Sequence, residues 1–242
     1  MAVIIFATLA SVAWSLWIRR ATWRCRWEVA ATANIALQGG AVALMAPATH
    51  ELLHRNISHE FNLTQYAAHD LYVVAASAIV YNTIGRLDDA HRFQWGFRQY
   101  VELPATLCIP LMLAAFTLGN GTKIYNPDFF NVPCDAWLTI YWVIFCSMTI
   151  YLLAYGARAL HILMENPQSR AIAKVYLTAC AFGILACIAR IYACFDYQWE
   201  LNWGDGLTWF TACSCGAIFA VASGRSWLEK TRWFTNRSLE RV

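Results

Sequence analysis

Long apolar stretches, nearly devoid of charge, alternate along this chain with short segments that hold most of its charged residues. A helix that crosses hydrocarbon about 30 Å thick needs about 20 mostly apolar residues, at about 1.5 Å per residue. Seven stretches approach or meet this length, at residues 2–18, 29–47, 67–84, 103–118, 136–155, 175–193 and 207–223. The sequence contains too few alternating polar positions to form a membrane β-barrel. The pattern therefore predicts an all-α membrane protein, a bundle of about seven transmembrane helices.

The composition indicates that lipid is the solvent for most of the chain. Of the 242 residues, 59% are hydrophobic and 14% are charged, whereas a soluble domain carries about a quarter charged residues. No basic segment precedes the first apolar stretch, so we expect this stretch to remain as a membrane helix. The connecting loops are short, which predicts a single domain over residues 1–242 in the plasma membrane. The net charge of +3 gives no indication of a nucleic-acid partner, and we expect none.

The positive charges predict the orientation of the bundle. If seven helices span, one side receives fifteen Lys and Arg residues and the other receives two, Arg55 and Lys123. The fifteen are Arg19, Arg20, Arg24, Arg26, Arg86, Arg92, Arg98, Arg158, Arg170, Lys174, Arg225, Lys230, Arg232, Arg237 and Arg241. Cytoplasmic loops are enriched in Lys and Arg. The sequence therefore predicts a cytoplasmic C-terminus and, with an odd number of spans, an N-terminus outside.

The C-terminal residues, about 225–242, resemble a short amphipathic tail on the cytoplasmic side. Trp227, Trp233 and Phe234 alternate there with charged residues such as Lys230 and Arg232. Such a segment can lie on the inner leaflet of a membrane, with its rings at the depth of the headgroups. The alternative is a frayed chain end.

The predicted outer face collects histidines and acidic residues. His50, Glu51 and His54 form the motif His-Glu-Leu-Leu-His. On a helix, residues four apart share a face, so both imidazoles could bind one zinc ion while Glu51 acts as the general base. The third ligand would come from His59, Glu60, His69 or Asp70, which follow in the sequence.

Three interpretations of this motif stay open at the level of sequence. The first is a catalytic zinc site, the second is a non-catalytic role in metal binding or proton sensing, and the third is a solvated outer loop. The Asn/Pro-rich second signature of intramembrane metalloproteases is only echoed here, around Asp128 and Asp135.

Arg190 falls within the sixth apolar stretch and should have a partner, because a charged side chain inside a membrane helix is costly. Asp70, Asp135 and Asp196 lie at a comparable expected depth. We expect Arg190 to pair with Asp70 or Asp196 and so to close the outer end of the bundle. The alternative is that Arg190 extends to the outer headgroups.

Most of the nine cysteines lie inside the apolar stretches, where small polarizable side chains suit contacts between helices. Cys134, in an outer loop, and Cys194, near the outer end of the sixth stretch, form the plausible disulfide pair. The outer side of a membrane is oxidising, so the sequence predicts that this bond forms.

The segment that runs from Asn62 and Leu63 through His69 and Asp70 to Ala76 resembles the entry to the third helix of poorly characterised actinobacterial multi-pass membrane proteins. The resemblance covers about a tenth of the chain and implies topology without an activity. An origin in an actinobacterial phage would imply a role in altering the host envelope or excluding other phages. A microbial rhodopsin is excluded, because residues 207–223 contain no Lys for a retinal Schiff base.

The sequence leaves two functional hypotheses from different classes. The leading one is a non-enzymatic membrane module that binds a ligand or another membrane protein, with metal or protons acting on its His-rich face. The runner-up is a zinc-dependent hydrolase that uses Glu51 together with His50 and His54. A channel or transporter lacks support, because the apolar stretches contain few ionisable residues.

Overall fold

The computed structural model describes residues 1–25, 28–56, 62–85, 87, 90–196 and 205–239. At residues 54–56, 90–93 and 232–239 it describes the backbone and not the side chains. Every regular element within these residues is helical. The elements are α1 (Ala2–Ile18), η1 (Arg20–Arg24), α2 (Val29–Met45), α3 (Pro47–Asn56), α4 (Leu63–Ile84), α5 (Ala90–Phe97), η2 (Arg98–Glu102), α6 (Leu103–Leu118), η3 (Phe129–Asn131), α7 (Ala136–Leu163), α8 (Pro167–Ala193) and α10 (Asp205–Leu239).

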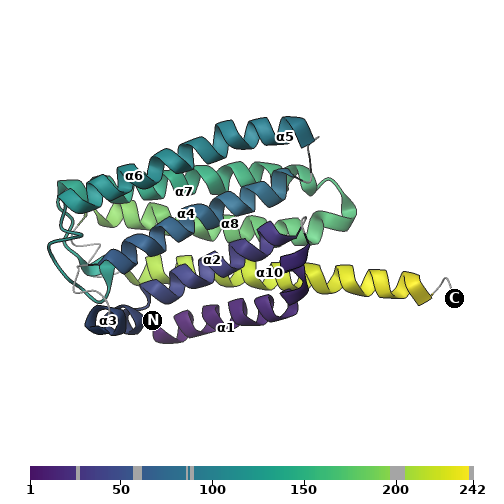
Figure 1. Ribbon diagram of the computed structural model, residues 1–242, viewed down its shortest axis with the longest axis horizontal. Helices are drawn as coiled ribbons and strands as arrows, with labels where there is room; N and C mark the ends of the chain where they lie inside the picture. Colours follow the sequence, from purple (N-terminus) through teal and green to yellow (C-terminus); the bar gives the residue numbers. More distant parts are fainter. Residues whose placement is uncertain (26–27, 57–61, 86, 88–89, 197–204, 240–242) are drawn as a thin grey trace.

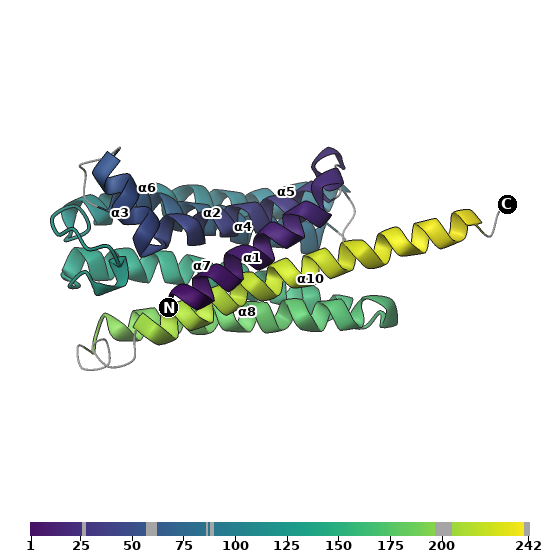
Figure 2. The same ribbon diagram turned by 90° about the horizontal axis from the view of Figure 1, so that it is seen from below.

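Six of the long helices form a closed ring in the order α1, α2, α4, α7, α8 and α10, in which each helix packs against the next and α10 returns to α1. Their axes follow the long dimension of the molecule (Figure 1). Helix α6 packs on the ring from outside, against α7 and α4. In the view turned by 90°, α1 lies obliquely along α10 (Figure 2). Helices α2 and α10 also contact each other directly, so the interior of the ring is lined by α2, α4, α7, α8 and α10.

Small residues allow the helices to approach closely. A side chain at Gly39 on α2 would meet Val12 on α1 at 2.5 Å. A side chain at Gly183 on α8 would meet Leu153 on α7 at 2.6 Å and Cys215 on α10 at 3.0 Å. Because lipid provides no hydrophobic drive between helices, such close packing supplies much of their association in a membrane.

Four helical segments are long and apolar enough to cross a membrane. They are Gln94–Leu118, Ala136–Leu163, Pro167–Ala193 and Asp205–Thr231. Helices α2 and α3, bent by 73° at their junction, make a fifth if they count as one broken span. Helix α1 is apolar but shorter, with 17 residues. The prediction of a helical membrane protein is thus confirmed in its coarse form, with four to five candidate spans among the described residues.

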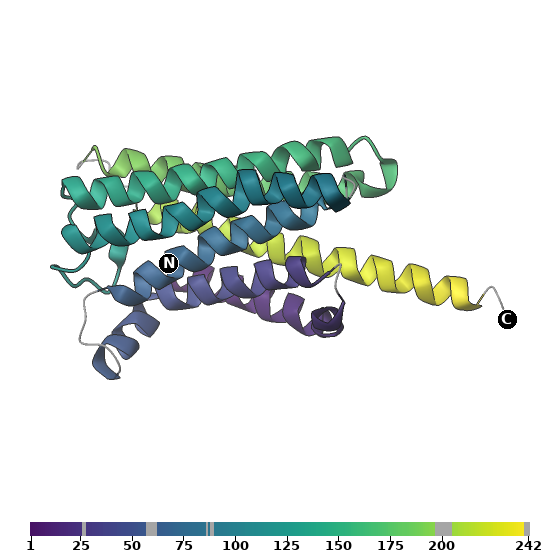
Figure 3. The same ribbon diagram turned by 45° about the horizontal axis from the view of Figure 1, so that its top comes forward.

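Each of the seven predicted segments lies along one of the ring helices or α6, but several helices extend further than expected. Helix α7 continues to Leu163, and α8 begins at Pro167. Helix α10 runs without interruption from Asp205 to Leu239 and projects well beyond the bundle (Figure 3). The expected amphipathic tail is therefore the continuation of α10 and not a separate segment.

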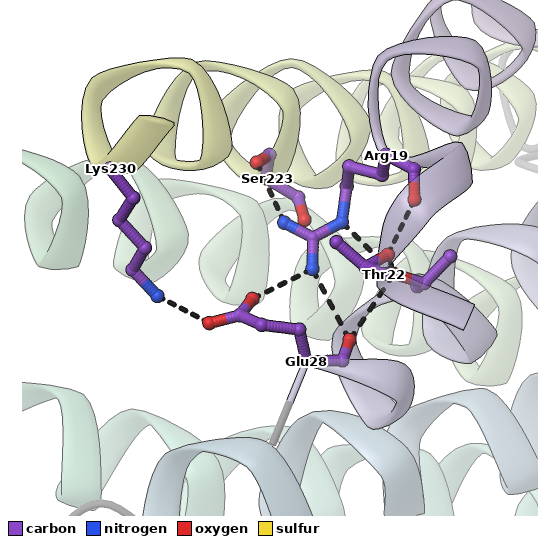
Figure 4. A network of polar contacts seen from close by, with 6 residues as sticks. Arg19, Thr22, Glu28, Ser223 and Lys230 are labelled. Atoms are coloured by element: carbon purple, nitrogen blue, oxygen red, sulfur yellow. Dashed lines mark hydrogen bonds and ion pairs between the residues drawn. The ribbon is translucent and has the colours of Figure 1, made fainter. Parts of the chain in front are cut away.

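A buried arginine joins three elements at the end of the ring that holds η1 and the start of α2, here called the Arg19 end. Arg19 follows α1 and is 1% exposed. Its guanidinium donates to the Glu28 carboxylate (2.8 Å), to the Glu28 carbonyl (3.2 Å), to the Thr32 hydroxyl (3.1 Å) and to the Ser223 carbonyl of α10 (3.1 Å). Figure 4 shows these contacts converging on the guanidinium. Every one of them is directional, so α1, α2 and α10 are fixed relative to one another here.

Lys230 of α10 completes this network by donating to the second carboxylate oxygen of Glu28 (Figure 4). Burial alone would raise the pKa of Glu28, but the hydrogen bonds and charges of Lys230 and Arg19 outweigh it and hold that pKa below its ordinary value of 4.5. Glu28 therefore stays ionised at neutral pH between two cations.

Candidate functional site

The opposite end of the ring is closed by the loop between α6 and α7, and we call it the Arg190 end. Asp135 caps α7 by accepting from the Leu138 amide at 2.8 Å and also accepts from the Asn120 amide at 3.3 Å. The short helix η3 turns Phe129 and Phe130 into the ring, where they are 1% and 4% exposed. The loop thus acts as an aromatic plug over the ring interior.

Asp128 holds this plug in place. Its carboxylate caps η3 by accepting from the Phe130 amide at 3.2 Å and accepts from the Trp209 indole of α10 at 3.2 Å. The side chain is buried, which raises the pKa of Asp128 above its ordinary value of 3.8, although Trp209, Phe130 and Arg190 all favour the charged form. The loop and α10 are therefore joined through one carboxylate.

Arg190 lies directly beneath the plug, in the last turn of α8, and is 1% exposed. Its Nη1 donates to the Phe130 carbonyl at 3.0 Å, and its Nη2 donates to the Cys134 sulfur at 3.4 Å. The guanidinium carbon lies 4.4 Å from the centre of the Trp142 ring. Arg190 also forms an ion pair with Asp205 of α10, at 3.8 Å between Nη1 and Oδ1. Aromatic faces and soft acceptors thus supply much of the environment of this charge.

The partner that the sequence did not anticipate for Arg190 is Asp205. The carboxylate of Asp196 accepts from the Tyr192 hydroxyl at 3.1 Å, and Asp70 is partly buried on α4. Pairing of Arg190 with either of them stays a prediction. In this structure Arg190 lies at the end of the ring that the α6–α7 loop closes.

Cys134 and Cys194 are neighbours, as their predicted pairing requires. Their sulfur atoms lie 3.5 Å apart, and both are thiols in this structure. A disulfide needs a sulfur separation of about 2.05 Å, so a small movement of the loop or of the end of α8 would be enough to form it. The disulfide itself stays a prediction.

His69 lies among aromatic rings on the inner face of α4 and is 1% exposed. Its Nδ1 is 2.6 Å from the hydroxyl of Tyr141. Phe145 and Trp142 lie against its ring, with centroids at 4.5 Å and 4.9 Å. In this structure His69 is a hydrogen-bonded member of the aromatic core, on α4, whereas His50 lies on α3.

The His-Glu-Leu-Leu-His motif lies on α3, after the bend. His50 is 2% exposed, and its Nδ1 is 3.0 Å from the Gln65 amide nitrogen and 3.2 Å from the Pro127 carbonyl. It accepts from the first or donates to the second, depending on its tautomer. His50 thus fastens α3 to α4 and to the plug loop. Glu51, one residue further, is exposed.

The proposed zinc ligands are only partly described. The side chain of His54 and the whole of His59 and Glu60 lie outside the described residues. Among the residues that the structure does describe, no three His, Cys, Asp or Glu side chains are gathered so that they could hold a metal ion. Zinc binding by the motif, with His50, His54, His59, His69 or Asp70 as ligands, stays a prediction.

A cavity of about 80 Å³ lies inside the ring below Arg190. Side chains from five helices line it, with Gln38 from α2, His69 from α4, Trp142 and Thr149 from α7, Arg190 from α8 and Trp209 from α10. Most of the remaining wall is apolar, from residues such as Met45, Ile79, Phe145 and Leu153. We call this the central cavity.

Among the neutral residues that line the central cavity, two have a buried side-chain polar atom with no hydrogen-bond partner within the described part of the chain. These atoms are the indole nitrogen of Trp142, whose side chain is fully buried, and the hydroxyl of Thr149. An unsatisfied buried polar group costs about 1–3 kcal/mol, and a buried donor left without a partner is therefore uncommon. These two groups mark the central cavity as a place where a hydrogen-bonding guest would be stabilised.

Sequence reasoning missed most of this site. The signal for Arg190 was its charge within an apolar stretch, but Trp142 is one of 12 Trp residues and nothing distinguishes it in the sequence. Asp128 and Asp205 lie outside the apolar stretches, where sequence does not fix distance. At the other end, the signal that could have been read is Glu28, an acidic residue that follows Arg19, Arg20, Arg24 and Arg26.

Comparisons with known proteins found no relative of this chain. The chain matches no protein-family model, no curated protein and no solved structure. The function must therefore be inferred from the ring, its closed end and the central cavity.

Proposed function

We propose that this protein is a seven-span membrane protein, with its N-terminus outside and its C-terminus in the cytoplasm, that binds a small uncharged ligand in the central cavity. The Arg190 end would face outward and the Arg19 end inward. The distribution of Lys and Arg supports this orientation, with fifteen on one side and two on the other. The 17 residues of α1 and the 22 residues of α4 fall within the range of about 17–25 residues for a spanning helix.

The topology is tested with reporters fused after residue 242 and inserted at Lys123 in the α6–α7 loop. We expect a cytoplasmic green fluorescent reporter to be active at the C-terminus and a periplasmic phosphatase reporter to be active at Lys123. Activity of the phosphatase at the C-terminus would contradict the proposed orientation.

The observation that carries the ligand-binding function is the pair of unsatisfied donors, Trp142 Nε1 and Thr149 Oγ1, in a largely apolar wall. Small-molecule sites typically combine an apolar wall with a few polar groups that fix the orientation of the ligand. An indole N–H can only donate, so the ligand must accept a hydrogen bond. We infer a binding role without catalysis because these groups can hold a guest but are not suited to exchanging protons with it.

The size of the central cavity limits the ligand. One water molecule occupies about 10–15 Å³ of such a cavity, so 80 Å³ corresponds to a guest of about five to eight non-hydrogen atoms. A compact, uncharged carbonyl compound meets both requirements. Its apolar body would pack against Phe145, Ile79 and Leu153, which line the cavity, and its oxygen would accept a hydrogen bond from the Trp142 indole N–H.

Thermal unfolding in detergent with a matched pair of probes tests this proposal. Cyclopentanone carries a hydrogen-bond acceptor, and methylenecyclopentane has the same shape without one. We expect millimolar cyclopentanone to raise the melting temperature of the protein by a few degrees and methylenecyclopentane to raise it less. Trp142→Phe should reduce the difference between the two probes, because it keeps an aromatic ring but removes one of the two donors.

The control variant is Trp95→Phe, which changes a Trp that is 64% exposed on α5, away from the ring interior. It should leave the preference for cyclopentanone unchanged. Equal stabilisation by the two probes in the unaltered protein would contradict the proposed role of the donors in the central cavity.

A further inference from the structure

A second and larger cavity opens at the Arg19 end of the ring. It measures about 440 Å³ and lies between α2, α4, α7, α8 and α10, and this volume is within the range of about 300–1,000 Å³ typical of small-molecule sites. Its floor is apolar, from side chains such as Ile79, Leu160 and Ala173. The site described above shares only Ile79 with it.

Amide and hydroxyl groups dominate the polar part of its wall. The amides belong to Asn34, Asn82, Asn166 and Gln168, and hydroxyls come from Ser169 and Ser226 among others. We call this the amide-lined cavity. Amides and hydroxyls both donate and accept hydrogen bonds, and so do the hydroxyl groups of a polyol. The wall is therefore matched to a ligand that carries several hydroxyl groups.

In two of these amides, the described hydrogen bonds use only one of the two polar groups, either the NH2 group or the oxygen. The Asn34 amide nitrogen donates to the Ala75 carbonyl at 2.8 Å, which leaves its oxygen as an acceptor. The Asn166 oxygen accepts from the Gln168 backbone amide at 3.0 Å as the cap of α8, which leaves its NH2 group as a donor. Because both amides are held by these bonds, an acceptor and a donor are presented in fixed orientations.

The charges at the amide-lined cavity favour an uncharged ligand over an anion. Lys230 and Glu229 both line it, one cation and one carboxylate. The ammonium of Lys230 is also bound to Glu28. An anionic ligand would meet an acidic side chain for each basic one, whereas a hydroxyl group can accept from Lys230 and donate to Glu229.

We propose that the amide-lined cavity binds a polyol ring, such as a sugar or inositol, presented either free or as the headgroup of a lipid. The location at one end of the helix ring is at the depth of lipid headgroups if the ring spans a bilayer, and the apolar floor can cover the non-polar face of such a ring. This inference does not depend on a ligand in the central cavity.

Lipid retention measured by native mass spectrometry of the full-length protein tests the proposal. Phosphatidylinositol and phosphatidylserine with identical acyl chains are offered together, because the two lipids have the same net charge and only the first ends in an uncharged polyol ring. We expect at least tenfold greater retention of phosphatidylinositol. Gln168→Leu combined with Ser226→Leu should reduce it to the level of phosphatidylserine, and Ala173→Phe should do the same by filling the floor.

The control variant is Gln99→Leu, which removes an exposed amide that does not line the amide-lined cavity and should retain the lipid as the unaltered protein does. If Ala173→Phe does not fold, the result with the double variant Gln168→Leu/Ser226→Leu decides the test. If added myo-inositol displaces the lipid, the free polyol is a sufficient ligand. If the protein keeps the lipid in the presence of myo-inositol, the polyol ring is bound as the headgroup of a lipid. Equal retention of the two lipids, or unchanged retention by the double variant, would overturn the proposal.

Discussion

Arg19 and Arg190 are both 1% exposed and both lie at the C-terminal end of a helix, yet their surroundings differ. Arg19 has a carboxylate at 2.8 Å, a hydroxyl and two carbonyls within hydrogen-bond distance. Arg190 has one carbonyl, one sulfur, two aromatic faces and a carboxylate at 3.8 Å. Charge-assisted hydrogen bonds are directional, while sulfur and aromatic contacts tolerate small displacements.

This difference indicates that the two ends of the ring have different tasks. The Arg19 end fixes α1, α2 and α10 in one arrangement. The Arg190 end holds the plug loop over the central cavity partly by sulfur and aromatic contacts, which tolerate small displacements. In the proposed function, these contacts would adjust when a ligand occupies the cavity.

The largest effect is expected when Arg19 is removed. Arg19→Ala leaves the Glu28 carboxylate buried with one of its two cations and removes the bond to α10. Breaking a buried pair in this way typically costs about 3–5 kcal/mol, so we expect a large loss of stability in detergent, measured by chemical unfolding. Arg20→Ala changes an exposed arginine that lies over the Trp17 ring and should cost less than about 1 kcal/mol. Equal losses would mean that the Arg19 network does not hold the helices together.

Removal of Arg190 should destabilise less and should change the binding of the probe. Arg190→Ala removes a hydrogen bond to Phe130 and the positive charge beside Asp128, for which we expect a loss of about 2 kcal/mol. Stabilisation by cyclopentanone should fall at the same time, since Arg190 lines the central cavity. The matched control is Arg158→Ala, at an exposed position on α7. If cyclopentanone stabilised Arg190→Ala as much as the unaltered protein, Arg190 would have no role in binding at the central cavity.

Oxidation should act on the Arg190 end alone. With oxidised glutathione, the thiols of Cys134 and Cys194 would lose two protons and two electrons to form a disulfide, and the glutathione disulfide would become two thiols. We expect a melting temperature higher by a few degrees, because the bond links the plug loop to α8. Cys134→Ser/Cys194→Ser should abolish the shift, and Cys25→Ser should not. If the melting temperature still rose in the double variant, the Cys134–Cys194 disulfide would not be the cause of the rise.

The smallest effects concern pH, and their signs are opposite at the two ends. The pKa of Glu28 is lowered, so its contribution to stability is present above about pH 4.5 and is lost as the pH falls through its folded-state value. The pKa of Asp128 is raised, so its ionisation reduces stability as the pH rises from about 3.8 through its folded-state value. Unfolding measured between pH 3.5 and 7 should therefore become less acid-sensitive in Glu28→Gln and more acid-sensitive in Asp128→Asn. The same change in both variants would contradict this assignment of the two carboxylates.

The sequence was informative about the helices because apolar length is a local property. It predicted α1 and α6 with the bounds that the structure has, at 2–18 and 103–118. The apolar stretches 136–155 and 175–193 are shorter than α7 and α8, which reach Leu163 and begin at Pro167, because a helix can continue past the apolar residues that define a span. The uninterrupted α10 was missed for the same reason, since the charges after Ser223 suggested a separate tail.

The candidate site was much less predictable. Arg190 could be selected from the sequence because a charge in an apolar stretch is rare, and Cys134 and Cys194 because they lie near the same predicted surface. Asp128, Trp142 and Trp209 could not be selected, since their roles depend on how the loop after α6 folds back into the ring. Arg19 was counted only among the positive charges of one side, and Glu28 was not selected, because contacts that bury them come from α10, about 200 residues later in the chain.

Hydrogen–deuterium exchange with and without cyclopentanone tests the difference between the two ends most directly. We predict that the probe slows exchange in peptides that cover the plug loop, residues 119–135, and leaves residues 17–32 at the Arg19 end unchanged. A slowing that is equal at both ends, or that is confined to the Arg19 end, would contradict the account of one fixed end and one adaptable end.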